Sequence, residues 1–141
     1  MVYNQYVVFK IEQQEFAVDI NRVKTIERVT AITRVPGAKG FVKGVINLRG
    51  DVIPVIDIKE RLGMGKCEYD DETRIIIVRV EEMEVGMIVD AASEVIKIQV
   101  EDIDKNLDYS RSIEDSLVEG VGKVGERIIV ILDVEKVLKI A

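Results

Sequence analysis

The sequence predicts an all-β fold made of two small barrels, and three observations lead to this prediction. Hydrophobic residues make up 48% of the 141-residue chain but include only three Phe, so Val, Ile and Leu must fill the core. Val and Ile favour strands because their branched side chains suit a pleated surface. Short apolar stretches bounded by turn residues run along the whole chain, and the sequence repeats itself once.

Period-two and continuous apolar stretches predict ten strands. Polar turns join several neighbours into hairpins, as Glu12-Gln13-Gln14 does for the first pair and Arg49-Gly50-Asp51 for a later pair. The expected strands are Tyr6–Ile11, Glu15–Ile20, Ala31–Val35, Val45–Leu48, Val52–Ile56, Arg74–Val80, Val85–Val89, Glu94–Val100, Leu117–Lys123 and Arg127–Leu132.

Helical signals are short. Asp57–Leu62 predicts one or two turns before Gly63, and Asp133–Ile140 predicts a C-terminal helix that begins with an Asp suited to N-capping. We interpret Asn21–Glu27 as a helical turn between strands. Glu101–Ser116 is polar and aperiodic, which indicates a long loop.

The internal repeat has two blocks in the same order. Gln5–Arg28 aligns without gaps on Arg74–Lys97 at a shift of 69 positions, and Gly44–Leu62 aligns on Gly120–Leu138 at a shift of 76. The long loop absorbs the difference between the shifts. In the second block five residues are identical, namely Gly44, Val45, Ile53, Asp57 and Leu62 with Gly120, Val121, Ile129, Asp133 and Leu138.

Each repeat unit offers about five short strands and a terminal helical turn, which suits a small closed barrel without open edges. A barrel of this size is only marginally stable on its own. We therefore expect the two barrels to bury a common hydrophobic seam within one domain, 1–141. The approximate barrel ranges are 12–72 and 73–133, and the terminal strand and helix can cross over between them.

Charge and composition exclude several functions. Twenty basic against 26 acidic residues give a net charge of −6, which argues against binding nucleic acid or an anionic membrane surface. Apolar runs are too short to insert into a bilayer. Cys67 is the only cysteine, so no internal disulfide can form, and no signal peptide is evident. We therefore expect a cytoplasmic protein.

Three motifs resemble functional sites but have simpler explanations. Gly120–Gly125 satisfies the G-x-G-x-x-G pattern, yet a strand follows it where a dinucleotide site needs a helix. Asp102–Asp108 resembles the start of a calcium loop but lacks the required glycine and glutamate positions. Arg49-Gly50-Asp51 is explained by a tight turn. The chain has no histidine, and Cys67 therefore lacks the usual base, so we expect no catalytic residue, metal or cofactor.

The segment Phe41–Asp57, with Asn47-Leu48-Arg49-Gly50 at its centre, resembles the signature of the CheW family of bacterial chemotaxis coupling proteins. The resemblance extends over nearly the whole chain. Phe16–Ile20 and Ile32–Pro36 look like the first half of the family, and Arg74–Val78, Val85–Asp90 and Ile129–Asp133 look like the second.

This resemblance implies two five-stranded SH3-like barrels and a non-enzymatic adaptor. Family members bridge the cytoplasmic helical tips of chemoreceptors to the regulatory domain of the histidine kinase CheA. The receptor-binding groove would use Ile20, Val23, Thr25 and Arg49. An apolar groove with one fixed cation suits an amphipathic helix. Alternatively, Ile20 and Val23 are core residues and Arg49 is a turn cation paired with a local carboxylate.

The resemblance places the kinase-binding surface on Phe41, Lys43, Gly44 and Val52. An exposed Phe and Val would form the apolar centre of this interface, with Lys43 at its rim. Each of these residues could instead serve core or loop packing, and Gly44 could serve only the backbone turn.

One residue departs from the family pattern. Thr25 stands where the pattern Val-x-Glu-Ile has an acid, so Arg49 lacks the expected partner, and Glu27 or Asp51 could replace it. In the second repeat unit Glu94 occupies the equivalent position.

Other functions stay open. The chain could be a regulatory module of a related kinase or the adaptor half of a receiver-fused coupling protein, although its length argues against both. A small-ligand or nucleic-acid-binding β-barrel would need exposed aromatic residues for stacking, and the chain has only four Tyr and three Phe. An enzyme that uses carboxylates alone would need a buried carboxylate with a raised pKa in a deep pocket.

Overall fold

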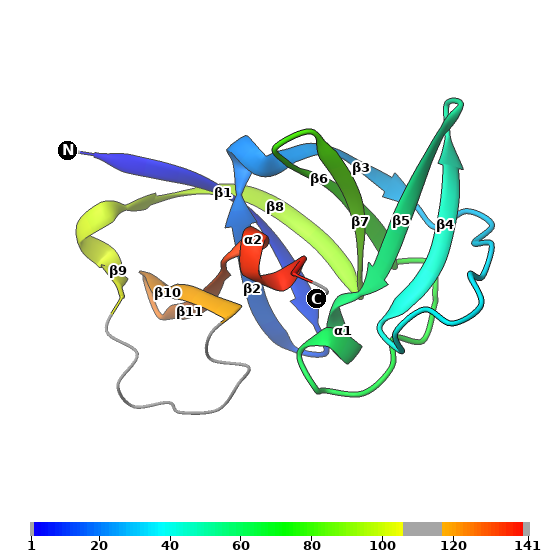
Figure 1. Cartoon of the computed structure of the whole chain (residues 1–141). Coiled ribbons are helices and arrows are strands. Elements are labelled where there is room, and N and C mark those ends of the chain that lie inside the picture. The colour runs from blue at the N-terminus through cyan, green and yellow to red at the C-terminus, as the bar shows by residue number, and fades with distance from the viewer. Residues whose placement is uncertain (1, 106–116, 140–141) are drawn as a thin grey trace.

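A computed structural model describes residues 2–105 and 117–139 of the chain (Figure 1). Strands dominate it, as the sequence predicts. The strands are β1 (Tyr3–Ile11), β2 (Gln14–Asp19), β3 (Val23–Arg28), β4 (Val42–Leu48), β5 (Asp51–Asp57), β6 (Arg74–Val80), β7 (Met83–Val89), β8 (Ala91–Gln99), β9 (Ile103–Asp104), β10 (Val118–Val124) and β11 (Arg127–Leu132). The short helices are η1 (Ile20–Arg22), α1 (Ile58–Arg61), η2 (Val100–Asp102) and α2 (Val134–Val137).

The strands form two sheets, each of which curls into a barrel. One sheet has six strands in the order β8-β1-β2-β11-β10-β9, and the other has five in the order β3-β6-β7-β5-β4. In the first sheet η2 connects β8 at one edge directly to β9 at the other, so the two edges must lie close together. Figure 1 shows the two sheets side by side, with the short helices α1 and α2 between them.

The two repeat units exchange their N-terminal hairpins. The β1–β2 hairpin of the first unit lies in the sheet that contains β10 and β11, and the β6–β7 hairpin of the second unit lies in the sheet that contains β4 and β5. The sheets therefore do not coincide with the sequential ranges 12–72 and 73–133. Exchange accounts for this difference, because each hairpin pairs with the copy of the sheet that belongs to the other repeat unit.

Equivalent strands keep the same register in both sheets. Val55 pairs with Gly86 in the parallel β5–β7 ladder, and their equivalents Ile131 and Ala17 pair in the β11–β2 ladder. The bulges also correspond: Lys24 is the extra residue of β3, and Ser93 is the extra residue of β8. The repeat found in the sequence is thus an approximate twofold symmetry of the fold.

Three hydrophobic clusters form the core. The largest joins both sheets and forms the expected seam; it includes Phe9, Val18, Ile76 and Met87 together with residues of α1 and α2. Smaller clusters fill the interior of each barrel, around Ile98 and Ile131 in the six-stranded sheet and around Ile75, Ile77 and Ile53 in the five-stranded sheet.

The structure corrects two predictions in the first unit. Asn21–Glu27 is not a helical turn, because η1 ends at Arg22 and β3 begins at Val23. Val23 and Ile26 have the spacing of a helical face, but the bulge at Lys24 places both on one face of a strand. Ala31–Val35 is not a full strand either. Only Thr33 forms a bridge, with Val45.

In the second unit, two expected boundaries also change. The long loop expected at Glu101–Ser116 begins with η2 and β9, and its remainder from 106 lies outside the described residues. Asp104 of β9 pairs with Val121, the equivalent of Val45, so β9 is the counterpart of the Thr33 bridge. The expected C-terminal helix Asp133–Ile140 is shorter, although Asp133 caps α2 as predicted. Within the described ranges, no helix is long and apolar enough to cross a bilayer.

A substitution at Gly86 tests the packing of the five-stranded barrel. A Cβ atom at this position would lie 2.7 Å from both Ile75 Cγ2 and Val55 Cγ1. We expect Gly86→Ala to lower the free energy of unfolding by about 1–3 kcal/mol, because overpacking displaces buried side chains. Urea denaturation would measure this change.

Gly40→Ala is the matched control. Its added Cβ would have one close neighbour, Glu60 Oε1 at 3.4 Å. We expect it to change the free energy of unfolding by less than about 0.5 kcal/mol. Equal stability of the two variants would contradict the tight interior described above.

Candidate functional site

Two of the three motifs that suggest chemistry have structural roles, and the third, Asp102–Asp108, extends from residue 106 outside the described residues. Gly120–Val124 belongs to β10, and Gly125 has a φ of +61° in the turn before β11. The G-x-G-x-x-G pattern is therefore a strand and a hairpin turn, as expected. Across ranges 2–105 and 117–139, no group of three or more Cys, Asp or Glu side chains is placed to hold a metal ion.

An enzyme that uses carboxylates alone would need a buried carboxylate with a raised pKa in a deep pocket. Among the described residues, Glu119 comes nearest to this condition. Burial, followed by the charge of Asp133, raises the pKa of its carboxyl group. However, the hollow beside it measures about 190 Å³ and is lined by further acids, including Asp19 and Glu135. Small-molecule sites usually occupy about 300–1,000 Å³, so this is not a substrate pocket of ordinary size.

Arg49 occupies the turn between β4 and β5, in agreement with the sequence prediction. Its φ is +51° and that of Gly50 is +91°, and the Gly50 N–H donates to Asn47 Oδ1 at 3.0 Å. These positive φ values favour a tight hairpin turn. The Arg49 side chain is 73% exposed, so its guanidinium is available to a partner.

Glu27 supplies the carboxylate partner of Arg49. Its Oε2 lies 3.7 Å from Arg49 Nη2 and also accepts a 2.8 Å hydrogen bond from Thr25 Oγ1. Thr25, Glu27 and Arg49 thus form one polar cluster, and Glu27 replaces the acid missing at position 25. In the second unit Arg127 contacts Glu94, the equivalent of Thr25, and binds Glu15 Oε2 at 2.6 Å.

The four residues expected at the receptor groove lie on two different faces. Residues paired across neighbouring strands point to the same face of a sheet. Val23 pairs with Val78 of the seam, and Ile20 also packs against the seam, so both are half-buried there. Thr25 pairs with Ile77 of the barrel interior, so it points with Arg49 to the other face of β3.

Two apolar residues of the seam face, Ile26 and Val95, were not among the expected site residues. Ile26 of β3 is 41% exposed and pairs with Ile76, and Val95 of β8 is 52% exposed and pairs with Val7. Both partners belong to the seam cluster, so Ile26 and Val95 also face the seam. They are equivalent residues of the repeat, and this equivalence is the signal that could have identified them.

The four residues expected at the kinase surface also lie in separate places. Phe41 packs partly against the seam, and the guanidinium carbon of Arg61 lies 5.2 Å from the centre of its ring. Lys43 Nζ lies 2.5 Å from Glu60 Oε2, so α1 engages both residues. Phe41 is therefore not the freely exposed apolar centre that the sequence suggested.

Val52 lies near the other end of the same hairpin and is 71% exposed. Val52 pairs with Asn47, whereas Val42, which follows Phe41, pairs with Ile56. The four residue steps from Val52 to Ile56 correspond to roughly 13 Å along a strand. Val52 and Phe41 thus do not form one continuous patch.

Gly44 has a structural role that the sequence could only suggest. It is buried, its φ is +143°, and a Cβ on it would lie 2.0 Å from the carbonyl oxygen of Thr33. Thr33 and Val45 exchange two backbone hydrogen bonds of 2.8 Å beside it. A glycine is required here because the bridging segment passes directly over it.

Comparison with known proteins agrees with this architecture. The family model described as a CheW-like domain matches residues 5–141. This chain belongs to the CheW family. A chemotaxis protein CheW of Bacillus subtilis is 40% identical over 132 residues, which cover 94% of this chain and 85% of that protein.

Two further relatives extend the comparison. The chemotaxis protein CheW of Thermotoga maritima is 33% identical over 93% of this chain and 85% of its own length. The crystal structure of the scaffolding protein TtCheW from Thermoanaerobacter tengcongensis matches with a TM-score of 0.88 and 34% identity, covering 99% of this chain and 90% of that one. The fold and the chemotaxis scaffold class are thereby established for this member of the CheW family.

The single cysteine of this CheW-family chain is chemically protected. Burial and the carboxylate of Asp90 raise the pKa of the Cys67 thiol to about 12, and Sγ lies 3.2 Å from Asp90 Oδ1. The Cys67 N–H also donates to Asp57 Oδ2 at 2.8 Å. Because the thiolate is the reactive form, the half-buried Cys67 acts as a hydrogen-bonding residue and not as an activated nucleophile.

Gly44→Ala distinguishes a structural role from a binding role for this glycine. We expect the added methyl group to break the Thr33–Val45 bridge and to lower the free energy of unfolding by about 2 kcal/mol or more. Chemical denaturation would measure the stability, and amide hydrogen exchange at Val45 would report the bridge. Unchanged stability and protection would contradict the structural role.

Cys67 alkylation tests the thiol environment. Iodoacetamide should react with the native protein far more slowly than with the protein unfolded in urea. As pH rises from 7 to 9, the rate for the unfolded protein should increase about 25-fold in total and begin to level off, because a free thiol ionises with a pKa of about 8.5. Because the native thiol stays protonated until about pH 12, the native rate should stay low throughout this range. Equal rates in both states would contradict a buried, hydrogen-bonded thiol.

Proposed function

We propose that this chain is a non-enzymatic adaptor that couples chemoreceptor tips to the regulatory domain of the histidine kinase CheA. Its two barrels act together as one domain, 1–141, and it works in the cytoplasm, where receptor tips and kinase meet. Membership of the CheW family gives the general scaffold role, and the surfaces described above support the two partners.

The observation that carries the receptor proposal is the pair of exposed, symmetry-equivalent apolar residues Ile26 and Val95. Both face the seam, and the half-buried Ile20 and Val23 adjoin it from η1 and β3. β3 and β8 are the edge strands of their sheets, and each pairs with a strand that buries its side chains in the seam. An amphipathic receptor helix would place its apolar face against this seam groove.

The polar cluster Thr25–Glu27–Arg49 supplies orientation to the same interaction. The Arg49 side chain is 73% exposed, so its 3.7 Å pair with Glu27 contributes less than about 1 kcal/mol to stability. Its effect is to keep the Arg49 guanidinium above β3, where a carboxylate of the receptor helix can replace or share Glu27. Such a charge fixes direction and register more than it adds affinity.

The kinase surface centres on Val52. A valine that is 71% exposed on the outer face of a hairpin is available for an apolar contact with another barrel. Phe41, Lys43 and Gly44 support this surface from the opposite end of the hairpin by fixing its position against α1 and the Thr33 segment. The receptor and the kinase thus use separate faces of one rigid body, so both can bind at once.

Two substitutions should separate the two activities. Val95→Asp should weaken binding of a receptor-tip fragment by at least tenfold, because it places a charge in the apolar groove. It should leave binding to the kinase regulatory domain within twofold of wild type. Val52→Asp should have the opposite effect. Isothermal titration calorimetry with each partner measures both affinities, and circular dichroism checks that both variants fold.

Two further variants test the role of the charge and provide a control: Arg49→Ala removes the cation, and Val2→Asp adds a charge elsewhere on the surface. Arg49→Ala should weaken receptor binding and reduce its dependence on ionic strength. Val2 is 70% exposed and outside both surfaces, so Val2→Asp should bind both partners normally. Failure of the wild-type chain to bind either partner would reject the adaptor function. Normal binding by Val95→Asp and Val52→Asp would reject the surfaces.

A further inference from the structure

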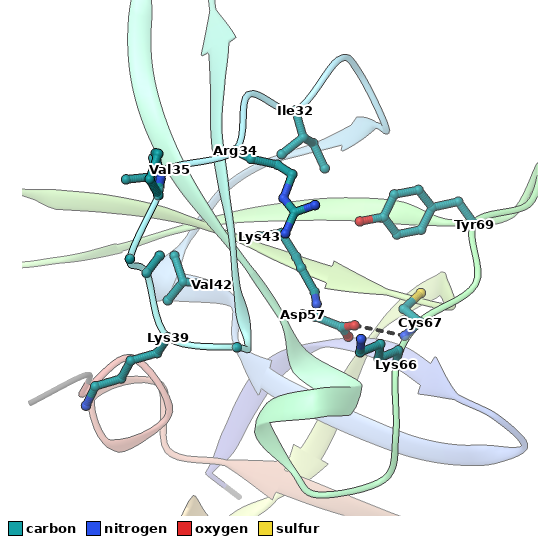
Figure 2. Close-up of a pocket in the computed structure, with 14 residues that line it drawn as sticks. Ile32, Arg34, Val35, Lys39, Val42, Lys43, Asp57, Lys66, Cys67 and Tyr69 are labelled. Atoms are coloured by element: carbon teal, nitrogen blue, oxygen red, sulfur yellow. Dashed lines mark hydrogen bonds between the residues drawn. The ribbon is translucent and has the colours of Figure 1, made fainter.

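A basic hollow of about 680 Å³ lies on the five-stranded barrel, away from the seam groove. It opens between the segment that connects β3 to β4 and the segment that follows α1. Figure 2 shows Arg34, Lys43 and Lys66 directed into this hollow, with Tyr69 facing them across it. Its volume falls within the range of about 300–1,000 Å³ that is common for small-molecule sites.

The charge of this hollow is opposite to that of the protein. Four cations line it, Arg34, Lys39, Lys43 and Lys66, against one acid, Asp57, in a chain with a net charge of −6. Asp57 is only 1% exposed, and its two oxygens accept backbone hydrogen bonds from Glu60 and Cys67. These bonds fix the Asp57 carboxylate in place, and its single charge can offset only one of the four cations.

Two of these cations have no acidic partner among the residues that the structure describes. Lys43 is neutralised by Glu60, whose Oε2 lies 2.5 Å away. Arg34 and Lys66 form no ion pair within the described ranges, although both reach toward the same hollow. Both side chains are exposed, so water and salt screen their mutual repulsion, but an anion in the hollow would gain attraction from both.

The other side chains that line the hollow indicate the chemistry of the rest of the ligand. Ile32, Val42 and the ring of Tyr69 present apolar surface beside the cations. Burial, followed by the nearby charge of Asp57, raises the pKa of the Tyr69 hydroxyl, so this group remains a hydrogen-bond donor at neutral pH. A donor hydroxyl, a guanidinium and an ammonium group together form a set that favours phosphate oxygens.

We propose that this hollow binds a phosphorylated small molecule. Its phosphate lies between Arg34 and Lys66, and its apolar part lies against Ile32, Val42 and Tyr69. Neither Arg34 nor Lys66 belongs to the receptor or kinase surface, so their variants test this site separately from the coupling function proposed above. Because Lys43 lines the hollow and also supports the kinase-facing hairpin, occupancy would alter that hairpin from the side opposite Val52.

Titration with pyrophosphate tests the proposal. The whole chain, at constant ionic strength, should bind pyrophosphate in a saturable one-to-one manner by isothermal titration calorimetry. Arg34→Gln and Lys66→Gln should each weaken this binding at least tenfold, because each removes a charge-assisted hydrogen bond. Lys97→Gln is the matched control. This exposed lysine of β8 lies outside the hollow, and its variant should bind like wild type.

Three results would overturn the proposal. The first is heat that does not saturate, or that chloride at the same ionic strength reproduces. The second is an equal loss of affinity in Lys97→Gln. The third is tighter binding of hexaglutamate than of pyrophosphate through Arg34 and Lys66, which would make the hollow a site for an acidic polypeptide. None of these results depends on receptor or kinase, so they leave the coupling function untouched.

Discussion

Strands β1 and β6 bury both of their faces, one inside a barrel and the other in the seam that the two barrels share. Val8 and Ile77 point into the barrel interiors, whereas Phe9 and Ile76 point into the seam. A small barrel cannot remove enough apolar surface from water by itself, so the seam provides the burial that both need. The exchange of hairpins strengthens this arrangement, because each barrel contains strands from both repeat units.

The seam also determines where partners can bind. It is closed in its centre by large side chains, but its border runs along the edge strands β3 and β8, where Ile26 and Val95 are only partly covered. A bulge in each edge strand turns these residues toward the seam and turns the neighbouring polar residues, Glu27 and Glu94, away from it. One backbone feature thus separates apolar side chains from charged ones along the border of the seam, an arrangement that suits an amphipathic helix.

Much of the fold could be predicted from the sequence, and less of the site. Hairpins and caps follow from local patterns of turn and capping residues, and the structure keeps them. The shared seam follows from the small size of each barrel. β3 was missed because its bulge mimics helical spacing at Val23 and Ile26. The resemblance to the CheW family suggested Arg49 and Val52, and the structure leaves both exposed. It could not show that Phe41 is covered by Arg61 and lies far along the hairpin from Val52.

The sequence by itself determined the class of the protein. Its Val- and Ile-rich strands, the repeat and the segment around Asn47–Gly50 were enough to indicate a double barrel of the CheW family, because these signals are local and do not depend on which strands pair. Only the tertiary structure decided that the units exchange hairpins, that Glu27 partners Arg49, and that Arg34 and Lys66 line one hollow. These arrangements bring together residues that are distant along the chain, and packing, not local pattern, selects them.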